Sequence, residues 1–235
     1  MKAVLFDMDG TLVPMDMEVF TKAYFKLLCA KAAGLGHDPK RIMNGMWKGI
    51  VAMIENDGRE SNSDLFWRVF AADYGESIVR DKYIFDEFYK SEFNATSEAC
   101  GYNPDAAKTV RRIIAAGCIV ALATNPVFPL TAQETRLGWT GLKPDEFAYI
   151  TAYENSHYCK PNPAYYREIL DALGLDARDC LMVGNDTSDD LAAREAGLDV
   201  FILTDCLVNS KGVDLSDIPH GDYAALNAYL DKWLM

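Results

Sequence analysis

The residues best suited to catalysis follow the first apolar segment of this chain. Asp7 and Asp9 come directly after Ala3 to Phe6 and precede Gly10 and Thr11. Because alternate residues of an extended chain point the same way, the two carboxylates lie on one side of it. One carboxylate can attack an electrophile while the other gives or takes a proton. The pair predicts a site of nucleophilic and acid–base catalysis at the end of the first strand.

Three later segments carry side chains that suit a phosphate group and a cation. Thr124 and Asn125 offer a hydroxyl and an amide to phosphate oxygens, and Lys160, followed by Pro161, offers a positive charge. Residues 184–190 read Gly-Asn-Asp-Thr-Ser-Asp-Asp, a run of carboxylates suited to a hard cation such as magnesium. Ligands bind open α/β sheets at the carboxyl ends of the strands, so we expect these segments to converge.

The elements that must position these residues alternate between strand and helix. Short apolar runs predict buried parallel strands at 2–6, 118–123, 180–183 and 200–203, and an additional strand at 147–152. Helical periodicity marks residues 163–173, 191–196 and 223–234, and another helix starts after the cap residue Asn103 and ends near Gly117. This order predicts an α/β fold with a doubly wound parallel sheet.

The stretch between the first strand and Asn103 has helical periodicity and almost no strand pattern. We expect helices at 16–33, 39–55, 63–72 and 82–93. The prediction is a second, smaller, all-helical cap domain at 16–99, inserted into a core domain made of 1–15 and 100–235.

Composition limits the partners of the protein. The chain has 35 acidic and 23 basic residues, a net charge of -12, which disfavours binding to nucleic acid or an anionic membrane. Its six cysteines include no C-x-x-C pair, which argues against a zinc cluster or a dithiol redox site. The apolar start is too short for a signal or membrane segment. We expect a cytoplasmic protein, a monomer or weak homo-oligomer, whose partner is a small-molecule phosphate ester.

Together, these motifs resemble those of the haloacid dehalogenase superfamily. The family's D-x-D-G-T-[LV] signature is present as Asp7 to Leu12, directly after an apolar amino-terminal strand. Its second motif corresponds to Thr124, its third to Lys160 and Pro161, and its fourth to residues 184–190, in the family's order. The resemblance spans nearly the whole chain and points to the phosphatase branch, with a Rossmann-like core and a helical cap after the first strand.

The resemblance implies a magnesium-dependent phosphohydrolase. Asp7 would attack phosphorus to form an aspartyl-phosphate, while Asp9 would protonate the leaving alcohol and later act as base on water. Lys160 would offset the repulsion between carboxylate and phosphate, and Thr124 and Asn125 would bind phosphoryl oxygens. The family's ligand pattern assigns Mg²⁺ to Asp7, to the backbone carbonyl of Asp9 and to a carboxylate of the fourth motif.

The fourth motif leaves two alignments open. Asn185 stands where the family usually has its metal-binding aspartate. If Asp186 is the ligand, Asp190 is the second carboxylate; if Asn185 is the ligand, Asp189 takes that place. We favour Asp186, because a charged oxygen binds magnesium better than an amide, with Asn185 and Asp190 in supporting positions.

Other functions fit parts of this pattern. A sugar-phosphate mutase of the same family would share the nucleophile and the acid, and a non-catalytic phospho-ligand-binding protein could keep the fold. A haloacid dehalogenase would need neither Asp9 nor a metal, and a phosphonate hydrolase would need a reactive lysine in the cap. Release of free phosphate, as opposed to a rearranged sugar phosphate, would separate a phosphatase from a mutase.

Overall fold

The computed structural model describes all of residues 1–235, and its centre is a parallel six-stranded sheet. The strands lie in the order β3-β2-β1-β4-β5-β6. Their bounds are β1 Ala3–Phe6, β2 Ile119–Leu122, β3 Tyr149–Ile150, β4 Cys180–Gly184, β5 Asp199–Leu203 and β6 His220–Gly221. The predicted doubly wound α/β fold is confirmed, and the additional strand predicted at 147–152 is present as the short β3.

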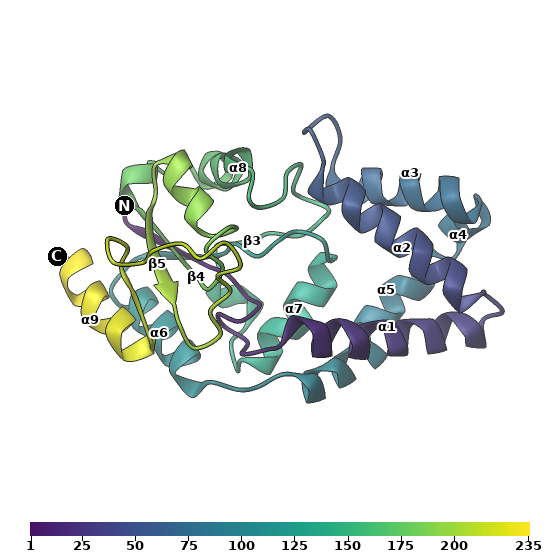
Figure 1. Cartoon of the computed structure of the whole chain (residues 1–235), viewed down its shortest axis with the longest axis horizontal. Coiled ribbons are helices and arrows are strands. Elements are labelled where there is room, and N and C mark those ends of the chain that lie inside the picture. Colours follow the sequence, from purple (N-terminus) through teal and green to yellow (C-terminus); the bar gives the residue numbers. More distant parts are fainter.

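Helices cover both faces of the sheet (Figure 1). One face carries α6 (Pro104–Ala115) and α9 (Tyr223–Trp233), and the other carries α8 (Pro163–Leu173) and the 3₁₀ helix η4 (Leu191–Ala196). Sequence analysis did not predict α7 (Leu130–Trp139), β6 or the short 3₁₀ helices η2 (Pro144–Glu146) and η3 (Ala177–Asp179). No helix has both the length and the apolar character needed to cross a membrane.

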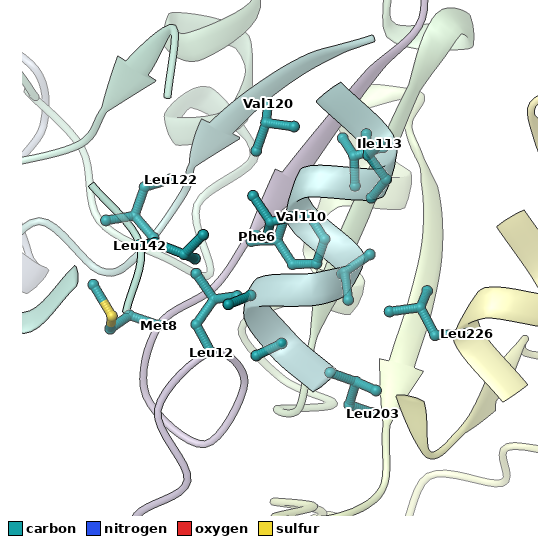
Figure 2. Packing of buried hydrophobic residues seen from close by; sticks show 14 of the residues in the cluster. Phe6, Met8, Leu12, Val110, Ile113, Val120, Leu122, Leu142, Leu203 and Leu226 are labelled. Atoms are coloured by element: carbon teal, nitrogen blue, oxygen red, sulfur yellow. The ribbon is translucent and has the colours of Figure 1, made fainter. Parts of the chain in front are cut away.

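Side chains of β1 alternate between the two faces. Val4 and Phe6 pack under α6 and α9, whereas Ala3 and Leu5 pack under α8. Figure 2 shows Phe6 beside Val110 of α6. Each buried aliphatic or aromatic side chain of this kind contributes about 1.5–3 kcal/mol to folding. The central strand is therefore anchored from both sides, which fixes the position of the residues that follow it.

Residues 17–99, here called the helical insertion, contain only helices and their connections. They are α1 Met17–Gly34, α2 Pro39–Ile54, α3 Asn62–Tyr74, α4 Ser77–Arg80, α5 Lys82–Lys90 and the 3₁₀ helix η1 Glu92–Ala99. The helix predicted at 82–93 thus ends early and continues as a 3₁₀ helix. In Figure 1 the insertion extends from one end of the molecule, and both chain termini lie on the core, away from its far end.

Local sequence explains where the insertion helices begin. The carboxylate of Asp16 accepts hydrogen bonds from the backbone N–H groups of Glu18 and Val19, and Asp38 caps α2 in the same way. Pro39 occupies the first turn of α2, where its missing N–H costs nothing. Side-chain caps of this kind contribute about 1 kcal/mol each.

The insertion enters and leaves the core at one place. The N–H of Gly101 donates to the carbonyl of Pro14 at 2.7 Å, and Met15 forms an isolated bridge with Cys100. Its interior is an aromatic cluster that also includes Tyr153 and Cys159 from the core. Because the helical insertion and the core share this cluster, the division into a cap domain at 16–99 and a core domain stays a prediction.

The aromatic cluster should determine the stability of the insertion. Phe88 of α5 is fully buried, whereas Tyr83 of the same helix is 64% exposed. We expect Phe88→Ala to lower the free energy of unfolding by about 3–5 kcal/mol, because it leaves a cavity. Tyr83→Ala is the matched control and should change it by less than about 0.5 kcal/mol. Urea unfolding followed by circular dichroism measures both values, and equal losses would contradict this description of the core.

Candidate active site

The loop after β1 places Asp7 in the interior of the protein. Asp7 is 7% exposed, and its backbone N–H donates to the carbonyl of Val183 in β4 at 2.9 Å. Gly10 then turns the chain with a φ of 82°, and a Cβ atom there would collide with the side chain of Asn185. Only glycine fits this position, because it combines a left-handed backbone with a close approach to the fourth motif.

Lys160 joins the first motif to the fourth. Its Nζ donates to Oδ1 of Asp7 at 2.8 Å and to Oδ1 of Asp190 at 2.7 Å, and all three side chains are buried. Lys160 lies between β3 and α8, so residues far apart in the sequence meet around one ammonium group. A buried charge of this kind is stable only when paired in this way.

Burial and the neighbouring charges shift the pKa values of Lys160 and Asp7. Burial lowers the pKa of Lys160, but the charges of Asp190 and Asp7 outweigh this effect and raise it well above its usual value. Burial raises the pKa of Asp7 to about 6, although Lys160 opposes the rise. At neutral pH the lysine is therefore charged and Asp7 is mostly ionised, which is the form a nucleophile needs.

The side chains of Asp190 and Asp186 accept hydrogen bonds from backbone N–H groups of the loop that follows β4. Oδ2 of Asp190 accepts the N–H of Asp186 at 2.9 Å, while Oδ1 of Asp186 accepts the N–H groups of Ser188 at 2.6 Å and Asp189 at 3.1 Å. A Cβ atom on Gly184 would collide with the carboxylate of Asp190. Asp190 is therefore tied to Lys160 and to its own loop, and Asp186 retains one carboxylate oxygen without a hydrogen bond.

Asn185 connects two loops. Its Oδ1 accepts the hydroxyl of Thr11 at 3.0 Å, and its Nδ2 donates to the carbonyl of Cys206 at 2.7 Å. Both ends of the amide are occupied by the protein. Asn185 thus holds the loop after β1 against the segment that follows β5.

The second motif contains polar atoms that lack partners. The backbone carbonyl of Thr124 accepts hydrogen bonds from the hydroxyls of Tyr165 and Thr151, at 2.7 and 2.8 Å, but its own Oγ1 is buried without a partner. Oδ1 of Asn125 is also buried and unpaired, and its Nδ2 lies 3.5 Å from Asp189. Unsatisfied buried polar atoms are rare, and here they suit a ligand that completes them.

A cavity of about 690 Å³ collects most of the predicted site residues. Polar residues of all four motifs line one part of it: Asp7, Asp9, Asn125, Lys160, Asn185, Asp186, Asp189 and Asp190. Thr124 is the exception, since it is 1% exposed and lies behind the wall. The rest of its wall, here called the outer cavity, is formed by the start of α1, the end of α2 and residues 127–128 and 206–208.

The donor set of the cavity fits a divalent cation. The cavity wall carries many more carboxylates than cations, and Lys160 is its one basic residue. Burial raises the pKa of Asp189 to about 6, and the nearby Asp186 and Asp190 add to this rise. Asp190 is paired with Lys160, but Asp186 and Asp189 form no ion pair, and oxygen ligands such as theirs are those that magnesium prefers. No three His, Cys, Asp or Glu side chains gather as a preformed metal cluster.

Sequence analysis missed Arg136. It lies on α7, is completely buried and forms an ion pair with Asp9. No motif marked this helix, because a single arginine in a short amphipathic stretch usually lies at the surface. Only the packing of α7 against the loop after β1 reveals the pair.

Comparison with known proteins identifies the family. Residues 1–197 match the model of the haloacid dehalogenase-like hydrolases. A phosphoglycolate phosphatase of Yersinia pestis is 29% identical over 207 residues, which cover 86% of this chain and 81% of the relative.

Solved structures show the same fold. A 2-haloacid dehalogenase from Pseudomonas syringae aligns with a TM-score of 0.62 and 23% identity, covering 99% of both chains. CbbY from Rhodobacter sphaeroides, solved in complex with phosphate, aligns with a TM-score of 0.60 and 20% identity, covering 98% of this chain and 99% of the other. With the motifs gathered around one cavity, the chain belongs to the haloacid dehalogenase-like hydrolases and is a phosphatase of that family.

Proposed function

We propose that this phosphatase is magnesium-dependent and cleaves a small phosphate ester through an aspartyl-phosphate on Asp7. The observation that carries the proposal is the contact of Lys160 with Asp7 in a cavity that Asp9 also lines. A buried carboxylate next to a fixed ammonium group, with a second carboxylate nearby, is the arrangement that nucleophilic attack on a phosphate ester needs.

Asp7 is the proposed nucleophile and Lys160 its electrostatic partner. A carboxylate and a phosphate repel each other at contact distance, and the repulsion is larger in a buried site than in water. The ammonium of Lys160 reduces this barrier from a fixed position, because Asp190 holds its other side. Thr124 and Asn125 are the proposed partners of the phosphoryl oxygens. The donors would be the hydroxyl of Thr124, which has no partner in the protein, and the Nδ2 group of Asn125, whose contact with Asp189 is long at 3.5 Å.

Asp9 is the proposed general acid and base. It first protonates the departing alcohol, and then accepts a proton from the water that attacks the aspartyl-phosphate. The bond between phosphorus and the Asp7 oxygen breaks in that second step, so the nucleophile is regenerated and inorganic phosphate leaves.

The proposed magnesium ligands are Asp7, the backbone carbonyl of Asp9 and Asp186. The free carboxylate oxygen of Asp186 supports this choice over Asn185, whose amide is already bonded at both ends. When bound, the ion supplies positive charge that offsets the charge on the transferring phosphoryl group.

The residues that line the outer cavity favour a substrate whose alcohol part carries no negative charge. Its wall is mainly apolar, through Met17, Ile50, Ile54, Val127, Phe128, Leu207 and Val208. The carboxylates of Asp16 and Glu18 lie at the same end, and the one lysine of the wall is tied to Asp7 and Asp190. Phosphoglycolate, which names the Yersinia relative, carries a carboxylate that this wall does not complement.

Loss of the nucleophile tests the reaction itself. With magnesium present, we expect Asp7→Asn to reduce hydrolysis of p-nitrophenyl phosphate by about a thousandfold or more, because an amide cannot replace the attacking carboxylate. Asp171→Asn makes the same chemical change at an exposed site of α8 and should leave the rate unchanged. Phosphate release unaffected in Asp7→Asn would disprove the mechanism. If no phosphate ester in a metabolite panel is turned over, a non-catalytic binding protein becomes the better interpretation.

The metal assignment has its own test. We expect Asp186→Asn to weaken the apparent affinity for Mg²⁺ at least about tenfold, measured by titrating the metal in the hydrolysis assay and by calorimetry without substrate. Asn185→Ser keeps a small polar group and should alter the affinity less, because Asn185 contacts protein groups. The reverse ranking would assign the ligand to Asn185.

The charge of the outer cavity predicts substrate preference. We expect the carboxamide analogue of 2-phosphoglycolate to have a kcat/KM about tenfold above that of 2-phosphoglycolate itself, which corresponds to about 1.4 kcal/mol. Glu18→Gln should narrow this difference by removing one of the nearby carboxylates. A preference for phosphoglycolate, unchanged by Glu18→Gln, would refute the argument from the wall.

A further inference from the structure

Arg136 is a buried charge to which the proposed reaction assigns no role. Its side chain is fully buried in α7, and its Nη1 donates to Oε1 of Gln133 at 3.0 Å. Removing a guanidinium from water costs several kcal/mol, so such a group persists only where a charged partner compensates it. The partner here is Asp9.

Aromatic rings hold the guanidinium in place. Its carbon lies 5.5 Å from the ring centre of Phe20 and 5.2 Å from that of Phe128. Phe20 belongs to α1 of the helical insertion, whereas Phe128 lies in the core just before α7. Burial lowers the pKa of Arg136 to about 10, with an opposing effect from Asp7, so the group stays charged at neutral pH.

The ion pair leaves part of Asp9 available to a substrate. Oδ1 of Asp9 is buried at the guanidinium, yet the side chain is 21% exposed and the residue lines the cavity. One carboxylate oxygen is thus fixed by the protein, while the exposed part of the side chain faces the reaction space. A carboxylate held at one oxygen has far fewer orientations than a free one.

We propose that Arg136 is a positioning residue that holds Asp9 as the base for hydrolysis of the aspartyl-phosphate. The inference rests on the proposed function, because it assumes that intermediate. In this step the water oxygen bonds to phosphorus, the bond from phosphorus to the Asp7 oxygen breaks, and the water proton passes to Asp9.

Pre-steady-state kinetics with p-nitrophenyl phosphate separates the two chemical steps. Nitrophenolate leaves without help from an acid, so transfer to Asp7 should depend little on Asp9. We expect Arg136→Met to release one nitrophenolate per active site at a rate within about threefold of the wild type. The later steady rate should fall about tenfold to a hundredfold, as part of the 100- to 10,000-fold effect of acid–base catalysis. The phosphorylated enzyme should accumulate and be trapped by acid quench.

Three comparisons keep the test decisive. Arg136→Lys restores the charge without the planar fork and should recover part of the steady rate, which matters if Arg136→Met folds poorly. Arg178→Met removes an arginine that is 86% exposed and should change neither phase. In the double variant Arg136→Met with Asp9→Asn, the losses should not multiply, because both changes disable the same base.

The outcomes are distinct. If both phases fall by the same factor in Arg136→Met, or if the steady rate does not change, Arg136 does not position the base. If the wild type shows no turnover, or turns over equally well with Asp7→Asn, then the proposed function fails and not this inference alone. Circular dichroism of each variant separates a smaller folded fraction, which lowers the burst amplitude, from a slower chemical step.

Discussion

The site depends on one buried ammonium group that must be neutralised. Lys160 contacts Asp7 and Asp190, which follow different strands of the sheet, and these partners compensate its removal from water. Neither carboxylate would be well placed without the lysine, since two buried anions would repel each other. The strand order puts β1 beside β4, which is what brings the two aspartates within reach of one Nζ atom.

Because Lys160 must be neutralised, the acidic residues around it have different roles. Asp190 uses its two oxygens on Lys160 and on the N–H of Asp186, so it is fully engaged in structure. Asp7 uses one oxygen on the lysine and lines the cavity, which suits it for the proposed chemistry. The position of the Asp190 carboxylate also explains why residue 184 is a glycine, because a Cβ atom there would occupy the space of that carboxylate.

Sequence patterns predicted the sheet and most helices because burial imposes their periods. The strand and helix periods are local properties, and side-chain caps such as Asp16 and Asn103 mark helix starts directly. The metal-binding residue of the fourth motif was harder to predict. Which of Asn185 and Asp186 has a free oxygen depends on bonds to Thr11 and to backbone groups of the loop, and spacing along the chain contains no record of them.

The pairing of Arg136 with Asp9 lay beyond prediction for a related reason. An arginine on an unmarked helix is indistinguishable in sequence from a surface residue until the partner is known. The partner and both flanking rings come from separate segments, one of them in the helical insertion. The contact of Phe20 with this guanidinium means that a shift of α1 relative to the core would change the surroundings of the group that holds Asp9. The insertion therefore contacts the proposed catalytic site in two places, along the cavity wall and at the arginine that pairs with Asp9.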